Sequence, residues 1–130
     1  MLKVVDANII IRYLTADSSE QVRRIKKLIN EGREKFILTD VTIAEIVWVL
    51  ASYYELSKEE ITEKILSLIE VPIFVANKSL IIQAIHCWQD YNIDYIDAYL
   101  IAFAKENNSL GLLSYDKSID KVKMISRFEP

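Results

Sequence analysis

Short apolar runs alternate along this chain with longer segments in which apolar residues recur at helical spacing. The short runs are typical of buried strands, because they are brief, rich in apolar side chains and separated by polar stretches. The expected strands are Leu2–Val5, Phe36–Leu38, Ile73–Val75, Leu110–Leu113 and Met124–Phe128.

Segments of helical period lie between these runs. One opens at Ser18–Gln21 and carries an apolar stripe behind it. Another opens at Ser57–Glu60, where the first and last residues have the spacing of a capping box. The other expected helices are Thr42–Tyr54, Ser79–Tyr91 and Asp94–Asn107.

Strands separated by helices favour crossover connections, and therefore a mostly parallel sheet covered by helices on both faces. In such α/β proteins, ligands bind beyond the carboxyl ends of the strands. Asp6 and Asp116 each follow an expected strand, so both should reach that edge of the sheet. Glu45 lies about one turn into a helix, and Asp97 lies early in the helix before the fourth strand.

Composition narrows the class of protein. The 130 residues fit a single domain, 1–130, with a sizeable core. No apolar run reaches the ~18–20 residues that a membrane span needs, and the first residues lack the apolar region of a signal peptide. The single cysteine, Cys87, is consistent with a reducing compartment. We therefore expect a cytoplasmic protein. Its net charge of −3 means that an anionic partner requires a local basic patch or a bound cation.

Four acidic residues stand within or beside the apolar runs: Asp6, Glu45, Asp97 and Asp116. Carboxylates are rarely buried unless they are paired or bind a metal, so we expect these four to share one site. Neighbouring carboxylates raise one another's pKa unless a cation offsets their charge. Mg²⁺ or Mn²⁺ suits oxygen ligands, whereas the usual zinc ligands are scarce here. Metal-assisted hydrolysis of a phosphodiester is the reaction that this chemistry favours.

The same residues resemble the motifs of a known family. Asp6-Ala7-Asn8 after the first strand resembles the opening of PIN-domain ribonucleases, and Glu45 within Ile43–Leu50 resembles their second acidic motif. Asp97-Ala98 at the start of a helix is similar to the third motif, and Ser114-Tyr115-Asp116 to the fourth. The order and intervals of the four motifs agree with the family from Asp6 to Asp116. Because the chain is short and has a single expected domain, it most resembles the VapC toxins of toxin–antitoxin pairs.

This resemblance implies a three-layer α/β/α sandwich with a central, mostly parallel sheet. It implies an endoribonuclease with one or two Mg²⁺ or Mn²⁺ ions held by Asp6, Glu45, Asp97 and Asp116. It further implies an RNA substrate, a cytoplasmic homodimer and a small antitoxin partner. Asn8 is expected to orient Asp6 or the turn after it, and Ser114 to form a hydrogen bond within the site.

Two further residues have two explanations each. Asp94 is either a fifth acidic group at the rim or the N-cap of the helix that carries Asp97. Arg12 lies one helical turn after Asn8, where it either faces the site opening or is an ordinary surface cation. The basic residues from Arg23 to Lys35 likewise form either a solvated surface or a patch for the RNA backbone.

Other functions also fit the motifs. A PIN-like nuclease of housekeeping RNA processing has the same residues, and a non-catalytic PIN-like module that binds RNA or protein has the same fold. All four acidic positions are filled, which argues against the non-catalytic alternative. A phosphoacceptor receiver domain fits less well, because it requires an acidic pair near its start, where only Asp6 stands.

Overall fold

The computed structural model describes residues 2–15, 19–109 and 111–130. Ser18 and Leu110, each at the start of an expected element, lie outside these residues. The chain divides into two compact units, Met1–Asn77 and Lys78–Pro130. Across the described residues, no helix has both the length and the apolar character needed to cross a membrane.

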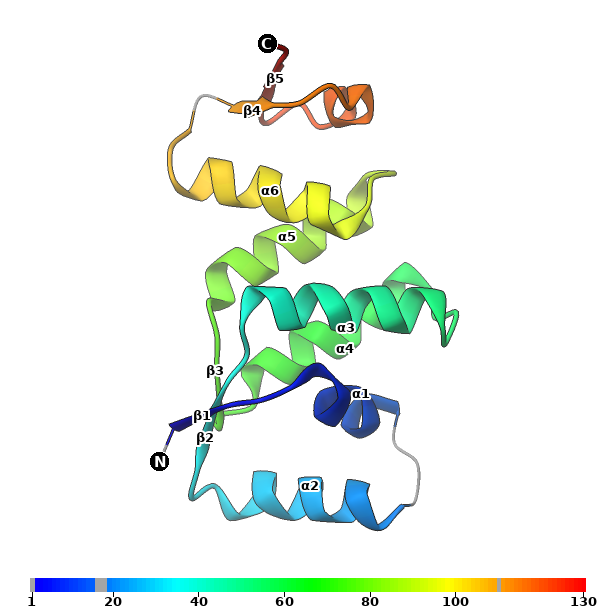
Figure 1. Ribbon diagram of the computed structural model, residues 1–130, viewed down its shortest axis with the longest axis vertical. Coiled ribbons are helices and arrows are strands. Elements are labelled where there is room, and N and C mark those ends of the chain that lie inside the picture. The colour runs from blue at the N-terminus through cyan, green and yellow to red at the C-terminus, as the bar shows by residue number, and fades with distance from the viewer. Residues whose placement is uncertain (1, 16–18, 110) are drawn as a thin grey trace. The chain divides into compact units, whose positions relative to one another are not determined.

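A parallel sheet forms the centre of the first unit (Figure 1). Its strands are β1 (Leu2–Val4), β2 (Lys35–Ile37) and β3 (Phe74–Val75), in the order β1-β2-β3. The register pairs Val4 with Ile37, and Phe36 with Phe74. Because all three strands are parallel, the segments that follow them leave the sheet at one edge.

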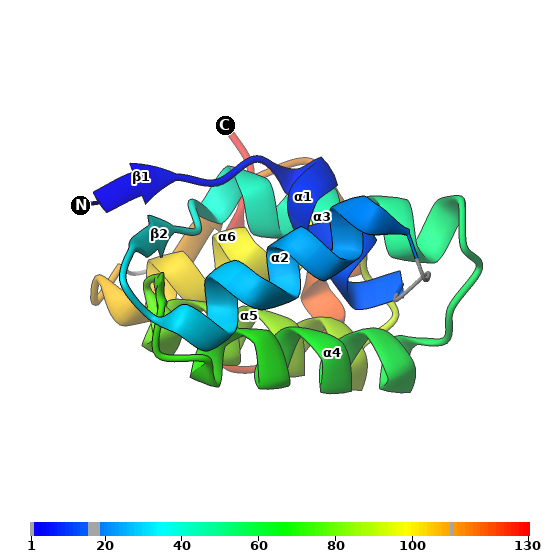
Figure 2. The same ribbon diagram turned by 90° about the horizontal axis from the view of Figure 1, so that it is seen from below.

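Four helices accompany this sheet in the described part of the unit: α1 (Ala7–Thr15), α2 (Glu20–Glu31), α3 (Asp40–Ser52) and α4 (Lys58–Glu70). The side chains of Ser19, Thr39 and Ser57 cap α2, α3 and α4, and Ser57 forms the expected capping box with Glu60. Gly32 ends α2 in the left-handed conformation, with φ of 63°, which glycine adopts without steric cost. In Figures 1 and 2, α2 runs beside α1.

The core of the first unit forms where apolar stripes of α3 and α4 pack together with α1 and the strand ends. The largest of its fully buried side chains are Ile10, Leu38, Ile43, Ile46, Leu50, Ile61, Ile65, Leu68 and Ile69. Most recur at intervals of three or four residues, which explains why the helical period was readable in the sequence.

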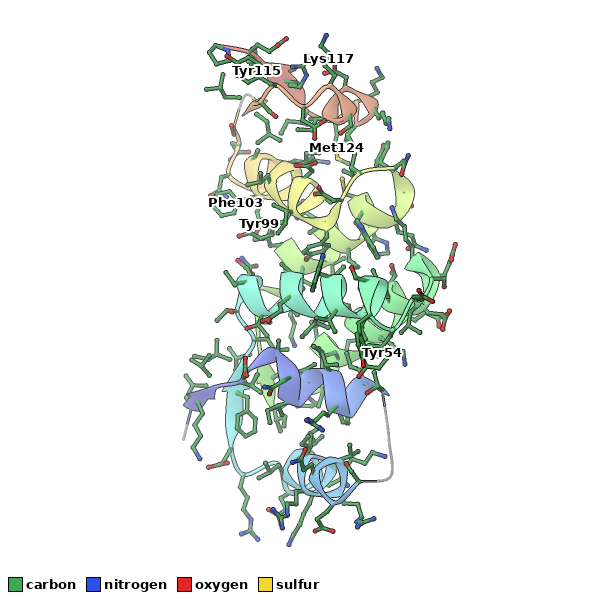
Figure 3. The ribbon with its side chains drawn as sticks, turned by 45° about the vertical axis from the view of Figure 1, so that its right-hand side comes forward. Tyr54, Tyr99, Phe103, Tyr115, Lys117 and Met124 are labelled. Carbon is green, nitrogen blue, oxygen red and sulfur yellow. The ribbon has the colours of Figure 1, made fainter. Side chains whose placement is uncertain are left out.

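The second unit pairs two helices and two strands. Helix α5 (Lys78–Asp90) packs against α6 (Tyr95–Glu106), and the rings of Trp88 and Tyr95 meet edge to face with centroids 6.3 Å apart. Strand β4 (Gly111–Leu113) is parallel to β5 (Ser126–Phe128), and the 3₁₀ helix η1 (Lys117–Lys121) lies between them in the chain. Figure 3 shows the α6 side chains Tyr99 and Phe103, whose rings are 6.0 Å apart.

The predicted α/β class, with helices around a central parallel sheet, is confirmed. Each expected strand overlaps an observed one, and β2 begins one residue before its prediction, at Lys35. The five expected helices are also present, and α3 begins two residues before the prediction. Two elements were not predicted: α1, whose three consecutive isoleucines have low helical propensity, and the short η1.

Candidate active site

Asp6 occupies the turn between β1 and α1. Val5 continues the strand by donating its backbone N–H to the carbonyl of Ile37 at 3.1 Å, and α1 begins at Ala7. The Asp6 carboxylate accepts the N–H of Ala7 at 2.9 Å, and its carbonyl accepts the N–H of Ile9 at 3.2 Å. The carboxylate therefore stands at the start of a helix, where unpaired N–H groups favour negative charge.

Glu45 belongs to α3, which starts at the same edge of the sheet. Thr39 follows β2 and caps the helix by accepting the N–H of Thr42 at 3.1 Å. Val4 and Ile37 are register partners, so Asp6 and Thr39 both stand two residues beyond that pair. The predicted positions of Asp6 after a strand and of Glu45 early in a helix agree with the structure.

None of the four acidic residues is buried, contrary to the expectation from their apolar settings. Asp6, Glu45 and Asp116 are exposed, and Asp97 is half-buried. For Glu45 the reason is plain, because α3 is apolar on all sides but buries only part of its surface. Val41 and Trp48, four residues before and three after Glu45, are 78% and 67% exposed.

In the second unit, two acidic residues lie close together. Asp94 is the N-cap of α6, and its carboxylate accepts the N–H of Asp97 at 2.9 Å. The Asp97 side chain is hydrogen-bonded to Asp94 and to Asp116, which follows β4. Asp94 is thus the N-cap of α6, which is one of the two alternatives considered for it, and its role as a fifth acidic group of the site stays a prediction.

Burial, followed by the negative charges of Asp94 and Asp116, raises the pKa of Asp97 to about 6. Asp116 behaves in the opposite way, because hydrogen bonds from Ser118 lower its pKa. The Ser118 N–H and hydroxyl donate to one Asp116 oxygen at 2.9 and 2.7 Å. Without a metal, Asp97 is therefore the member of the pair that holds the shared proton, and Asp116 carries the charge.

The turn that carries Asp116 is fixed by two side chains. Ser114 accepts the Asp116 N–H on its hydroxyl at 3.0 Å. Arg127 donates to the Ser114 carbonyl at 2.9 Å and forms a two-pronged ion pair with Asp120 at 2.9 and 3.2 Å. Sequence reasoning missed Arg127 and Ser118. The signal available for Arg127 was its place as a lone cation within the last apolar run.

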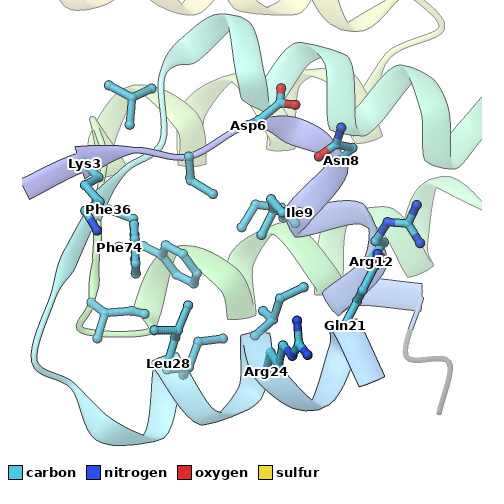
Figure 4. A pocket seen from close by; sticks show the side chains of 16 residues that line it. Lys3, Asp6, Asn8, Ile9, Arg12, Gln21, Arg24, Leu28, Phe36 and Phe74 are labelled. Atoms are coloured by element: carbon cyan, nitrogen blue, oxygen red, sulfur yellow. The ribbon is translucent and has the colours of Figure 1, made fainter. Parts of the chain in front are cut away.

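Asn8 and Arg12 stand on α1, near Asp6. Both are exposed, and both line a cavity of the first unit whose wall includes Asp6 (Figure 4). A role for Arg12 at the opening of the site stays a prediction. Cys87, by contrast, is buried in α5, and burial raises the pKa of its thiol to about 11, which suits packing and not nucleophilic chemistry.

The chemistry of these groups fits a hard divalent cation. Asp97 and Asp116 provide carboxylate oxygens close enough to share a proton, and an ion that replaces this proton would satisfy both charges. Within the described residues of either unit, no three histidine, cysteine or acidic side chains are grouped closely enough to hold an ion.

Comparison with known proteins identifies the family. The PIN domain matches residues 3–124, a span that includes all four acidic motifs. No curated protein matches the chain. PIN domains have a nuclease-like fold and are generally metal-dependent ribonucleases. Because the match covers nearly the whole chain, this protein belongs to the PIN domain family.

Proposed function

We propose that this protein is a divalent-metal-dependent endoribonuclease that hydrolyses phosphodiester bonds in RNA. The observation that carries the proposal is the hydrogen-bonded pair Asp97–Asp116, in a chain whose family match spans all four acidic motifs. Two carboxylates held this close are costly for folding unless a cation or proton offsets their charge.

In this proposal Asp6, Glu45, Asp97 and Asp116 hold one or two Mg²⁺ or Mn²⁺ ions. The bound ion supplies an activated water and offsets the charge on the phosphate. Below a pH of about 6, Asp97 would lose its proton to make room for the ion, and Asp94 keeps the start of α6 in place. Ser114, with Arg127 behind it, orients Asp116 through the backbone. Asn8 and Arg12 follow Asp6 on α1, where Arg12 would offer a cation to the RNA backbone.

The test is cleavage of total RNA by the purified protein with Mn²⁺ or with EDTA, followed by mapping of the cut ends. Asp6→Asn and Asp97→Asn should each abolish Mn²⁺-dependent cleavage while the circular dichroism spectrum is unchanged. Asp90→Asn, which removes an exposed carboxylate at the end of α5, is the matched control and should cleave normally. Full activity in Asp6→Asn or Asp97→Asn would refute the proposed site.

We further propose a toxin role like that of VapC proteins, with a cytoplasmic homodimer and a small antitoxin as partner. The resemblance of the four motifs supports this role, and the alternative is housekeeping RNA processing by the same chemistry. Induction in a bacterial host should arrest growth for the parent protein and not for Asp6→Asn. Relief of the arrest by the product of a neighbouring short gene supports the toxin role, and normal growth on induction contradicts it.

A further inference from the structure

A cavity of the first unit lies between the sheet, α1 and α2. It has a volume of about 700 Å³, within the range of roughly 300–1,000 Å³ that small-molecule sites occupy. Figure 4 shows Asp6 and Asn8 at one edge of this cavity, and Leu28 and Arg24 reaching toward it from α2. A member of the proposed metal site is therefore part of the wall of a space large enough for a ligand.

The walls of this cavity are mainly apolar, and two of them are aromatic. Phe36 of β2 and Phe74 of β3 present their rings, whose centroids are 6.4 Å apart and whose planes are inclined by 46°. Ile9 and Leu28 line the cavity from α1 and α2. A flat, aromatic ligand suits this lining, because every nucleobase has a face that stacks on aromatic rings.

Cations border the same cavity. Its lining includes Lys3, Arg12 and Arg24, against a single carboxylate, that of Asp6. Lys3 is engaged by Glu34 at 2.9 Å, and Arg24 has a solvent-exposed ion pair with Glu20 at 3.5 Å. Arg12 has no acidic partner within 4.0 Å among the described residues. Among the described residues, Arg12 is therefore the lining cation whose charge no ion pair offsets, which favours a phosphate-bearing ligand beside it.

We propose that this cavity binds one nucleobase of the RNA substrate close to the cleaved bond, with Arg12 and Arg24 contacting the adjoining phosphates. The inference rests on the proposed nuclease function and adds a site that selects the RNA. The base lies among Phe36, Phe74 and Leu28, while the backbone passes the cationic rim toward Asp6. This arrangement makes the cavity a determinant of which nucleotide stands beside the scissile phosphate.

The test uses a short single-stranded RNA that spans a mapped cut site or, if no cut is found, a mixed-sequence RNA. A set of otherwise identical RNAs is also prepared, and each of them lacks the base at a different single position. Leu28→Trp fills the cavity from a position that is 43% exposed, so the core is not overpacked. Arg12→Gln removes the one lining cation that has no ion-pair partner among the described residues, and it leaves the cavity open. Lys27→Ala is the control, because Lys27 is a cation of α2, the helix of Arg24 and Leu28, but does not line the cavity.

Two measurements are made on each pair of protein and RNA. Fluorescence anisotropy in EDTA reports binding without cleavage, and Mn²⁺-dependent cleavage reports kcat/KM. For the parent and for Lys27→Ala, removing the base at one position should weaken binding by about 10- to 100-fold. In Leu28→Trp, removing the same base should not weaken RNA binding further. Arg12→Gln should weaken the binding of every RNA and reduce the salt dependence of that binding.

Equal tolerance of base removal at all positions would overturn the inference, and so would a base preference that survives in Leu28→Trp. If Leu28→Trp loses a copurifying protein while its RNA binding is unchanged, the cavity belongs to a protein segment and the inference is wrong. A different result would refute the proposed nuclease function alone. A parent protein that keeps the base preference in EDTA but cuts no RNA retains the nucleobase site and refutes the proposed activity.

Discussion

Replacing Asp94 by Asn is the most direct probe of the Asp97–Asp116 pair. The Asn side chain keeps an oxygen that can accept the Asp97 N–H, so the cap of α6 is retained while the negative charge is removed. The charge of Asp94 is the second cause, after burial, of the raised pKa of Asp97. In metal-free protein, the substitution should therefore lower that pKa.

The structure sets the expected size of this effect. The pKa of Asp97 is raised from 3.8 to about 6, and burial, the largest cause, is unchanged in Asp94→Asn. We expect the pKa to fall by about 0.5–1 unit, since a single neighbouring charge is removed. Asp94→Ala should lower it too, but it also removes the cap and should cost about 1 kcal/mol of stability.

The raised pKa of Asp97 should also make the free energy of unfolding depend on pH. Folded Asp97 binds its proton more tightly than unfolded Asp97, so the contribution of this group to stability is fully present below pH 3.8 and is lost as pH rises through about 6. The full pKa shift of Asp97 corresponds to about 3 kcal/mol of unfolding free energy, and partial exposure of its side chain reduces this to roughly 1–2 kcal/mol. Above pH 6, Asp94→Asn should recover part of the unfolding free energy that the parent protein loses.

The assay is a carbon-detected NMR titration of the aspartate carboxyl groups in EDTA-treated protein, with urea unfolding at each pH. The parent should show a carboxyl group with a midpoint near 6 that is absent from Asp97→Asn. An Asp97 midpoint near 3.8 in the parent would refute the proposed proton-sharing pair, and an unchanged midpoint in Asp94→Asn would refute the role of its charge.

Three further predictions follow from particular contacts. Thr62 is 4% exposed, and its hydroxyl has no hydrogen-bond partner among the described residues, so Thr62→Val should raise the unfolding free energy by about 1 kcal/mol in urea titrations. Arg127→Gln should lower the thermal midpoint and kcat with little change in RNA affinity. The reason is that it loosens the Ser114–Asp116 turn and leaves the cavity beside Asp6 intact. An unchanged kcat contradicts this role of Arg127. Mn²⁺ binding should release about one proton near pH 5 and almost none near pH 7.5. Calorimetry in buffers of different ionisation enthalpy measures this release, and equal release at both pH values contradicts the shared proton.

Much of the local structure was readable from the sequence because it depends on neighbours in the chain. The capping box at Ser57 and Glu60 joins residues three apart, and the buried stripe of α4 follows the helical period. The placement of Asp6 and Asp116 after strands is of the same kind, since a strand and the residue after it are contiguous. The sequence could also assign the family, because its motifs keep their order.

Other features depended on packing between distant segments. The isoleucines of α1 have poor helical propensity, yet Ile10 and Ile11 are buried and the helix forms against α3. Glu45 lies within an apolar run but remains exposed, because burial depends on which helix face has a neighbour and not on the composition of the run. That the four acidic residues hold a common ion stays a prediction, to be tested by the metal-binding and cleavage experiments above.

The sequence by itself determined the α/β class, the positions of most helices and strands, and the four acidic motifs. Only the tertiary structure decided that Asp97 and Asp116 share a hydrogen bond, that Arg127 supports the turn between β4 and η1, and that a cavity adjoins Asp6. The physical reason is that capping and periodicity act over a few residues. A pKa shift or a cavity, in contrast, arises from groups that folding brings together from distant parts of the chain.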